Sequence, residues 1–424
     1  MKKNCFEIKK CNGLYGKIIN QTSKNATLPI MSASLLCDDK VKILETPKIT
    51  DVENMIKILK KIGVKIKREG RDVLINATTA DKSQVDCELS KTMRSSLFLL
   101  GSMLSKFRHV SISAPGGCEI GKRPIDIHID SLKKLGVEVE TRKECFVFDA
   151  KKAKAGTIKL KIPSVGATEN IIQFACKLKG VTTIINPAKE PEIVDLCNFL
   201  NQMGAKILGA GTNKITIYGV NKLRHTEYKP IGDRIVVGTI LTAVALCGGD
   251  VEISNAVPYQ NLKLIKIMRS MGCQIGYKND IIHIIKDKSL ISAKQISTGY
   301  YPQFATDLQS LMLTLSCVSE GKTTITERVF ENRFLTVPEL QKMGANIKTL
   351  NSKKVVVNGV KELKGASVVA KDLRGGASLV LAGLVANGKT MVENIHFIDR
   401  GYENLEKVLS KLGAKIRRVW QRRE

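Results

Sequence analysis

Several features that define common protein classes are scarce in this chain of 424 residues. It has no uninterrupted apolar run of the roughly 18 residues that span a bilayer, and its N-terminal segment is charged without an apolar core. We therefore expect neither a membrane span nor export. The eleven cysteines are scattered, with no Cys-x-x-Cys pair and no histidine cluster beside them, which argues against a disulfide framework and a zinc site. This pattern favours a cytoplasmic protein.

Acidic and aromatic residues are also few. The chain has 40 Asp and Glu against 68 Lys and Arg, a formal net charge of +28, and its aromatic content is 5%. The cations are mostly dispersed lysines, without blocks of like charge, interleaved aromatics or a recognised nucleic-acid module. Nucleic acid is therefore not expected as the main ligand, whereas anionic small substrates fit the charge.

One pattern, a helix followed by a glycine and a strand, recurs six times along the chain. Apolar residues at helical spacing precede each glycine, and alternating apolar residues follow it, as in 55–66. The six glycines are Gly63, Gly136, Gly204, Gly272, Gly344 and Gly413, which lie 73, 68, 68, 72 and 69 residues apart. The pattern predicts a left-handed glycine cap at each helix end. Second helices that are almost wholly apolar, such as 311–318 and 377–384, predict helices buried on most sides.

The chain is longer than the roughly 250–300 residues at which single cores usually stop growing. Three repeats in each half would build two similar α/β domains that divide near Asp233, with a ligand site in the cleft between the halves. A single elongated array of six repeats is the alternative.

The segment 114–124 places one thiol, Cys118, among glycines that favour a surface loop. Arg123 and the neighbouring Lys122 favour the thiolate of Cys118, whereas Glu119 opposes it, so the sequence leaves its ionisation state open. The segment indicates either a reactive cysteine or an incidental free thiol.

Charged and small polar residues also recur where apolar helices are expected to begin. Taken singly, each group fits a helix cap or a surface ion pair. Together they predict a ring of anion-binding groups facing a cleft, because a helix N-terminus and a cation both favour a bound anion. These stretches are 24–25, 91–96, 164–168, 304–308, 330–334, 372–376 and 398–402.

These stretches, together with Glu190 to Asp195 and the Cys118 loop, occur in the order found in UDP-N-acetylglucosamine enolpyruvyl transferases, and the chain resembles that family from about Ile18 to Ile416. The resemblance implies two inside-out α/β barrel domains of three repeats each, with the active site in the interdomain cleft. Residues 21–232 would form the N-terminal-type domain with the Cys118 loop. Residues 1–20 and 233–424 would form the C-terminal-type catalytic domain.

The resemblance also implies the reaction. The enolpyruvyl group of phosphoenolpyruvate would move to the 3-hydroxyl of UDP-N-acetylglucosamine with release of phosphate, by addition and then elimination, as the first committed step of peptidoglycan synthesis. Such chemistry needs an acid, a base and several cations. It needs no metal or organic cofactor. In this family the cysteine matched by Cys118 also forms an adduct with phosphoenolpyruvate and is alkylated by fosfomycin.

Each matched position takes its expected role from the same resemblance. Cys118 is the general acid at C3 and Asp307 the base, while Asp372 lies near the reacting carbon. The positions expected to act in catalysis are Cys118, Asp307, Lys24, Arg400 and Asp372. Those expected to bind phosphoenolpyruvate are Lys24, Asn25, Arg123, Arg333, Arg374 and Arg400. Those expected to bind UDP-N-acetylglucosamine are Arg94, Arg123, Pro124, Ile125, Asp126, Ile127, Ser164, Val165, Gly166, Asp307 and Val329.

The chain departs from the family pattern beside one of these residues. Ser-Gly-Ala usually precedes the lysine and asparagine, whereas this chain has Gln21, Thr22 and Ser23. The changed turn before Lys24 leaves open an enolpyruvyl transferase paralogue with a different acceptor or weak activity. The high positive charge leaves open a non-catalytic relative that binds anions or nucleic acid.

Overall fold

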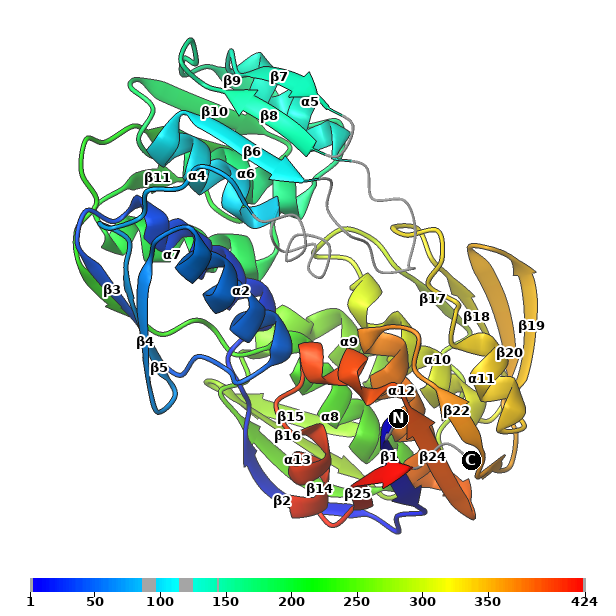
Figure 1. The fold of residues 1–424 in the computed structure, drawn as a ribbon. Coiled ribbons are helices and arrows are strands. Elements are labelled where there is room, and N and C mark those ends of the chain that lie inside the picture. The colour runs from blue at the N-terminus through cyan, green and yellow to red at the C-terminus, as the bar shows by residue number, and fades with distance from the viewer. Residues whose placement is uncertain (1–2, 86–96, 114–124, 143–144, 422–424) are drawn as a thin grey trace. The chain divides into compact units, whose positions relative to one another are not determined.

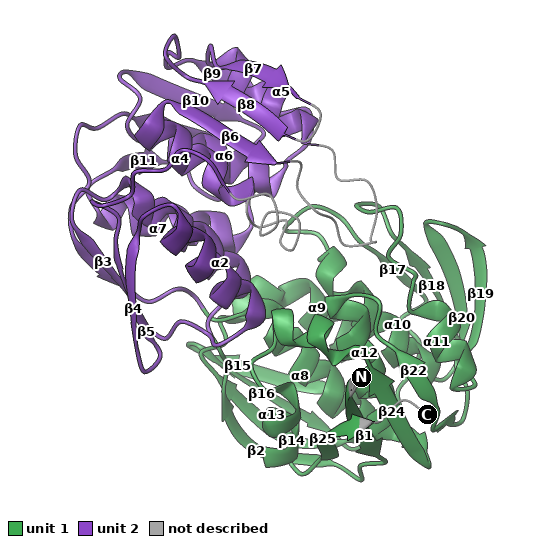
Figure 2. Cartoon of the chain, viewed as in Figure 1, with its two compact units in different colours: residues 1–21, 119–122, 232–424 green, residues 22–118, 123–231 purple. Residues whose placement is uncertain are grey.

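The computed structural model describes residues 3–85, 97–113, 125–142 and 145–421. The chain divides into two compact units, coloured separately in Figure 2. Unit 1 contains the described residues up to Gln21 and from Gly232 onward, and unit 2 contains those from Thr22 to Ile231. Each unit has its own cluster of buried apolar side chains.

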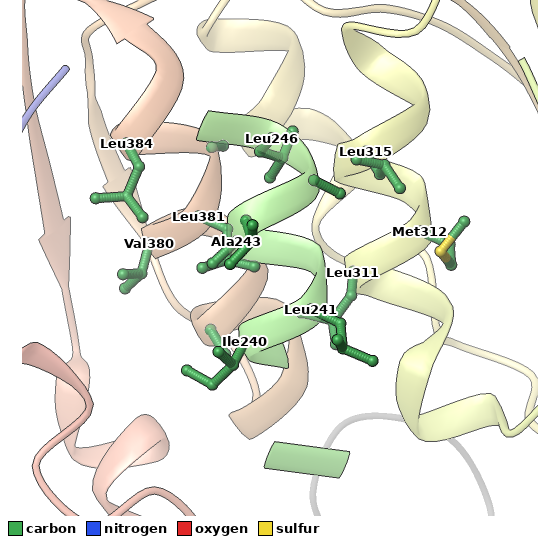
Figure 3. Packing of buried hydrophobic residues seen from close by; sticks show 14 of the residues in the cluster. Ile240, Leu241, Ala243, Leu246, Leu311, Met312, Leu315, Val380, Leu381 and Leu384 are labelled. Carbon is green, nitrogen blue, oxygen red and sulfur yellow. The ribbon is translucent and has the colours of Figure 1, made fainter. Parts of the chain in front are cut away.

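Three helices form the centre of each unit. Nearly all of their residues are buried, as their apolar sequences predict. In unit 2 they are α1 (Lys24–Ala33), α4 (Leu99–Phe107) and α6 (Val165–Ala175). In unit 1 they are α8 (Arg234–Cys247), α10 (Gln309–Cys317) and α12 (Leu373–Val385). Figure 3 shows apolar side chains of α8, among them Leu241 and Ala243, packed between α10 and α12.

A second, amphipathic helix in each repeat buries one face and exposes the other. These helices are α2 (Thr50–Lys61), α5 (Asp126–Lys134), α7 (Pro191–Gln202), α9 (Leu262–Ser270), α11 (Val337–Lys342) and α13 (Leu405–Lys411). The glycine that follows each of them has a positive φ, between 84° at Gly136 and 106° at Gly272 and Gly413. The predicted left-handed caps are therefore confirmed. A strand begins within two residues of each glycine, as the repeat pattern predicts.

Each repeat also contributes one small sheet (Figure 1). Five of these sheets contain an antiparallel hairpin, and in the sixth β1 (Lys3–Lys9) lies between two antiparallel partners, β24 (Lys389–Glu393) and β25 (Lys415–Gln421). In unit 2 the strands are β3 (Lys40–Ile43), β4 (Lys65–Glu69), β5 (Asp72–Asn76) and β13 (Thr226–Tyr228); β6 (His109–Ser113), β7 (Glu138–Thr141) and β8 (Cys145–Asp149); and β9 (Thr157–Lys159), β10 (Val181–Ile185), β11 (Lys206–Leu208) and β12 (Lys214–Tyr218).

In unit 1 the strands are β2 (Leu14–Ile19), β14 (Gly249–Ser254), β15 (Gln274–Lys278) and β16 (Ile281–Lys286); β17 (Gln295–Ser297), β18 (Lys322–Thr326), β19 (Asn346–Asn351) and β20 (Lys354–Asn358); and β1 (Lys3–Lys9), β22 (Ser367–Val369), β24 (Lys389–Glu393) and β25 (Lys415–Gln421). Unit 1 also contains a separate two-stranded parallel sheet of β21 (Leu363–Lys364) and β23 (Ala386–Asn387).

Five of the six repeat sheets have one parallel pair at an edge, for example β2 beside β14. Strand β1 lies antiparallel between β24 and β25, with Ile8 opposite Ile416. Because helices occupy the centre of each unit and sheets surround them, the fold is that of two inside-out α/β barrels of three repeats each. This confirms the fold class expected from the sequence.

Candidate active site

A carboxylate and two guanidinium groups meet at the start of α10 in unit 1. Asp307 lies in the 3-10 helix η4 (Thr306–Leu308), which leads directly into α10. Arg333 donates from Nη2 to Asp307 Oδ1 over 2.5 Å, and Arg374 Nη2 lies 3.8 Å from Asp307 Oδ2. The structure thus brings together three residues that are 26 or more positions apart in the chain.

The two guanidinium groups are almost fully buried. The side chain of Arg333 is 2% exposed and that of Arg374 is 4% exposed, whereas Asp307 is 28% exposed. Among the residues that the structure describes, Nε and Nη1 of Arg333 and Nη1 of Arg374 have no hydrogen-bond partner. Buried N–H donors are normally satisfied, so these donors indicate a site that takes an anion. A planar carboxylate matches the planar guanidinium groups.

Tyr402 lies against the guanidinium group of Arg374. The guanidinium carbon of Arg374 lies 5.6 Å from the centre of the Tyr402 ring. Burial lowers the pKa of Arg374, but Tyr402 and the Asp307 carboxylate outweigh burial and hold this pKa above its ordinary value. The hydroxyl of Tyr402 also lies 2.9 Å from that of Thr239 in α8. Arg374 is therefore cationic, as an arginine side chain is at any ordinary pH.

Glu327 organises the surroundings of Asp307, and sequence reasoning missed it. Its buried carboxylate follows β18 and accepts from the Oγ1 atoms of Thr298 and Thr306, over 2.8 and 2.9 Å. It also accepts from the backbone N–H groups of Val329 and Phe330, over 2.7 and 3.1 Å. These bonds fix the residue before Asp307 and the loop that precedes Arg333. The only signal in the sequence was a charged residue directly after the strand β18.

Asp372 is the N-cap of α12. Its Oδ1 atom accepts from the backbone N–H groups of Arg374 and Gly375, both over 2.9 Å. This bond pair is the preferred way to satisfy the first amides of a helix, and here it also fixes the residue that carries the Arg374 guanidinium. Asp233 caps α8 in the same way through Ile235 and Val236.

Arg400 does not lie at a helix start. It is the last residue of the 3-10 helix η5 (Ile395–Arg400), which follows β24. The preceding Asp399 receives two parallel bonds from Arg418 in β25, over 2.8 and 2.7 Å. Arg418 also donates to Glu406 over 3.1 Å. The sequence pattern grouped Arg400 with helix starts, and the structure corrects that placement.

Lys24 is the first residue of α1 in unit 2, with Ser23 as the N-cap. A cation at this end of a helix opposes the helix dipole unless an anion balances it. Asp51 supplies part of that balance, since its Oδ2 atom lies 3.3 Å from the Lys24 ammonium group. Asn25 follows Lys24 and is partly exposed. The position suits a group that binds a phosphate at a helix N-terminus.

Ser164, Val165 and Gly166 open α6 in unit 2, and all three are partly exposed. The Ser164 hydroxyl accepts from Ala167 N–H over 3.4 Å as the N-cap. A Cβ atom on Gly166 would lie 2.9 Å from Cε1 of His128 in α5, so only glycine allows this close approach.

His128 is held by Asn170 of α6, whose Nδ2 atom lies 2.8 Å from His128 Nδ1. Asn170 also bonds Leu97 O and Gly101 N–H, which assigns its amide nitrogen as the donor to His128. The remaining residues expected here, Ile125, Asp126 and Ile127, lie at the start of α5.

Four expected site residues fall outside the described part of the chain. These are Arg94, Cys118, Arg123 and Pro124. The described residues include no group of three His, Cys, Asp or Glu side chains able to hold a metal ion. None of the helices that the described segments form combines the length and hydropathy needed to cross a membrane.

Comparison with known proteins identifies the family of this chain. Residues 8–409 match the family described as EPSP synthase (3-phosphoshikimate 1-carboxyvinyltransferase). UDP-N-acetylglucosamine 1-carboxyvinyltransferase 2 of Caldanaerobacter subterraneus subsp. tengcongensis is 45% identical over 98% of this chain and 99% of its own length. UDP-N-acetylglucosamine 1-carboxyvinyltransferase 1 of Clostridium acetobutylicum is 43% identical over 98% of this chain and all of its own.

Solved structures agree on the fold. The enolpyruvyl transferase NikO from Streptomyces tendae matches with a TM-score of 0.89 at 24% identity, over all of both chains. An EPSP synthase from Acinetobacter baumannii matches with a TM-score of 0.75 at 17% identity, over 98% of this chain and all of that one. With near-complete coverage at 43% and 45% identity, the chain belongs to the UDP-N-acetylglucosamine 1-carboxyvinyltransferases, within the wider enolpyruvyl transferase family.

Proposed function

We propose that this protein transfers the enolpyruvyl group of phosphoenolpyruvate to the 3-hydroxyl of UDP-N-acetylglucosamine and releases phosphate, the first committed step of peptidoglycan synthesis. The observation that carries the proposal is the cluster of Arg333, Arg374 and Asp307. It presents unpartnered guanidinium donors beside a partly exposed carboxylate, within a chain of this family.

The two guanidinium groups are assigned to the carboxylate of phosphoenolpyruvate. Their N–H donors are planar and fixed by burial, so little reorganisation is needed when a planar anion binds. Lys24 and Arg400 are assigned to the phosphate, together with Arg123. Asn25 is assigned to the same substrate. A dry cationic surrounding also stabilises the charge that develops on the departing phosphate.

Asp307 is assigned the role of general base. In the addition step the sugar 3-hydroxyl attacks C2 of phosphoenolpyruvate, its proton passes to Asp307, and a proton from the Cys118 thiol is added at C3. In the elimination step a proton passes from C3 back to the Cys118 thiolate and the bond from C2 to the phosphate oxygen breaks, which restores the double bond and releases phosphate. Arg333 holds the Asp307 carboxylate in place for this transfer.

The nucleotide sugar is assigned to a set of residues that overlaps this centre. They are Arg94, Arg123 and Pro124, together with the start of α5 at 125–127 and the start of α6 at 164–166 in unit 2. In unit 1 they are Asp307 and Val329, whose relative positions the Glu327 carboxylate fixes. Asp372 is assigned to hold Arg374, because it caps the helix on which Arg374 lies.

The test is phosphate release from phosphoenolpyruvate by the purified protein, with and without UDP-N-acetylglucosamine. We expect release only when the nucleotide sugar is present. Cys118→Ala should abolish it, and fosfomycin should both inhibit the wild type and add its mass to Cys118. Cys145→Ala is the matched control, because Cys145 is a partly exposed free cysteine in β8 that has no assigned role.

Two outcomes would contradict the proposal. Release with shikimate 3-phosphate but not with UDP-N-acetylglucosamine would assign a different acceptor. A folded sample that releases no phosphate with either acceptor would indicate a non-catalytic relative, and a steep salt dependence of nucleic-acid binding would then identify the charge as the functional feature.

A further inference from the structure

Gln21 forms a two-point contact with the backbone that follows Arg400. Its amide Nε2 donates to the carbonyl of Gly401 over 3.1 Å, and its Oε1 accepts from the N–H of Glu403 over 2.9 Å. The three residues belong to unit 1, where Gln21 is the last residue before the chain enters unit 2. The side chain thus uses both ends of its amide on a segment 380 positions away.

The backbone that carries Gln21 is itself fixed. Its carbonyl accepts from Asp233 N–H over 2.9 Å. The preceding Asn20 donates from Nδ2 to the carbonyls of Asp233 and Asn255, over 3.2 and 3.0 Å, and Asn255 Nδ2 donates to Asn20 O over 2.9 Å. Because these hydrogen bonds hold the backbone at Asn20 and Gln21, the side-chain amide of Gln21 restrains the backbone positions of Gly401 and Glu403.

Other contacts hold the residues next to Arg400. Asp399 receives two bonds from Arg418, as described above, and the Tyr402 hydroxyl contacts that of Thr239. Gly401 is buried so closely against α12 that an added Cβ atom would lie 2.9 Å from Leu373 Cδ2. Arg400 therefore lies on a backbone that is anchored on both sides, and Gln21 supplies the anchor that immediately follows it.

A contribution to the stability of the fold does not account well for the two hydrogen bonds of the Gln21 side chain. Ordering a glutamine side chain costs about 1.5–2 kcal/mol in rotamer entropy, which two partly exposed hydrogen bonds only about offset. Gln21 also lies beyond the end of β2 and is not needed for the pairing of β2 with β14. What its amide does determine is where the backbone after Arg400 lies.

We propose that Gln21 is a positioning residue for Arg400, which sets the guanidinium for the phosphate of phosphoenolpyruvate. This inference rests on the proposed function. It gives a role to a residue that differs from the serine usual at this place.

The test compares Gln21→Met with Gln341→Met. Methionine keeps the length of the side chain and removes both ends of the amide. Gln341 is a matched control in the same unit, since its Nε2 atom also donates to a backbone carbonyl, that of Ile347, over 2.9 Å. We expect Gln21→Met to raise KM for phosphoenolpyruvate about tenfold, with KM for UDP-N-acetylglucosamine and the unfolding midpoint close to those of the control.

A double-mutant cycle identifies the route of the effect. If Gln21 acts through Arg400, then Gln21→Met should cost nothing more in kcat/KM once Arg400→Ala is present. Additive effects would overturn the proposal, and so would a KM for phosphoenolpyruvate equal to that of Gln341→Met. A loss confined to the unfolding midpoint would likewise assign Gln21 to stability alone.

A second measurement tests the positioning role independently of turnover. Phosphoenolpyruvate that binds the folded protein raises its unfolding midpoint, and this shift can be measured for the wild type and for each variant. A wild type without turnover contradicts the proposed function, yet a midpoint shift that Gln21→Met reduces and Gln341→Met keeps would still support the positioning role. A wild type with turnover whose Gln21→Met variant matches the control contradicts only the positioning role. Absence of both turnover and shift contradicts both.

Discussion

Arg333 reaches Oδ1 of Asp307 over 2.5 Å while its own side chain is 2% exposed and that of Asp307 is 28% exposed. One partner is thus locked in the protein interior, and the other keeps part of its carboxylate accessible. A base that must meet a substrate hydroxyl needs both properties, a fixed position and an exposed oxygen. The first prediction follows from this pair.

Asp307→Asn should reduce kcat by about 10²–10⁴-fold and leave KM for phosphoenolpyruvate within a few fold. The amide keeps the shape of the side chain but cannot accept a proton. Steady-state rates of phosphate release measure the effect. Asp250→Asn is the control, because Asp250 forms a surface pair with His283 in the same unit. Equal kcat values for the two variants would remove Asp307 from the base role.

Arg374→Lys should raise KM for phosphoenolpyruvate by about 10–100-fold. Lysine keeps the charge but loses the planar pair of donors that matches a carboxylate. Arg269→Lys serves as control, since Arg269 donates to the Ile275 carbonyl over 2.9 Å and has no assigned role. Initial rates over a range of phosphoenolpyruvate concentrations give the comparison, and an unchanged KM would mean that the substrate carboxylate binds elsewhere.

Glu327→Gln should lower the free energy of unfolding by about 1–3 kcal/mol and reduce kcat/KM as well. Three of the four partners of this buried carboxylate donate to Oε1, and the Thr306 hydroxyl donates to Oε2. An amide N–H₂ group in the place of Oε2 would require this hydroxyl to turn and accept, and would bury a second N–H that has no acceptor among these partners. Denaturant unfolding and phosphate release are measured on the same samples. Glu320→Gln, on the exposed surface of the same unit, should change neither quantity.

Gly166→Ala should raise KM for UDP-N-acetylglucosamine and spare KM for phosphoenolpyruvate. The added methyl group would lie 2.9 Å from His128 Cε1, which forces α5 away from the start of α6. Such overpacking typically costs about 1–3 kcal/mol, or roughly 5–150-fold in binding if the site bears the whole cost. Gly276→Ala is the control, because nothing lies within 4 Å of its added Cβ atom. Equal KM values for the two variants would contradict the assignment.

Asp195 should make unit 2 less stable as the pH rises. Burial raises the pKa of Asp195 to about 6, although Tyr228 O–H and Ile231 N–H donate to it over 2.6 and 3.1 Å. Because the folded pKa exceeds the ordinary value near 3.9, the proton stabilises the fold below pH 4, and this contribution is lost as the pH rises through 6.

Asp195→Asn provides the measurement, because its amide does not titrate. The free energy of unfolding of the wild type minus that of the variant should fall by up to about 3 kcal/mol between pH 4 and pH 7. Denaturant unfolding at four pH values across this window measures the difference. A constant difference would mean that Asp195 titrates at its ordinary pKa.

The amino-acid sequence by itself predicted the repeats, the fold class and the family. The positive φ at all six glycines confirms the helix caps, and the relatives confirm the family resemblance. The beginnings of α1, α6 and α12 also lie where polar residues precede apolar runs. These features depend on near neighbours in the chain, because hydrogen bonds within a turn and the spacing of apolar residues are local properties.

Other features were decided by the tertiary structure alone. Arg333 meets Asp307 across 26 positions, and Gln21 meets Gly401 across 380. The role of Glu327 could not be read from the sequence, because its four partners come from three separate segments. The roles assigned to the site residues stay predictions. Helix and cap patterns are encoded within about four residues, whereas the packing of six repeats determines which distant side chains share a buried polar site, and no local pattern records that choice.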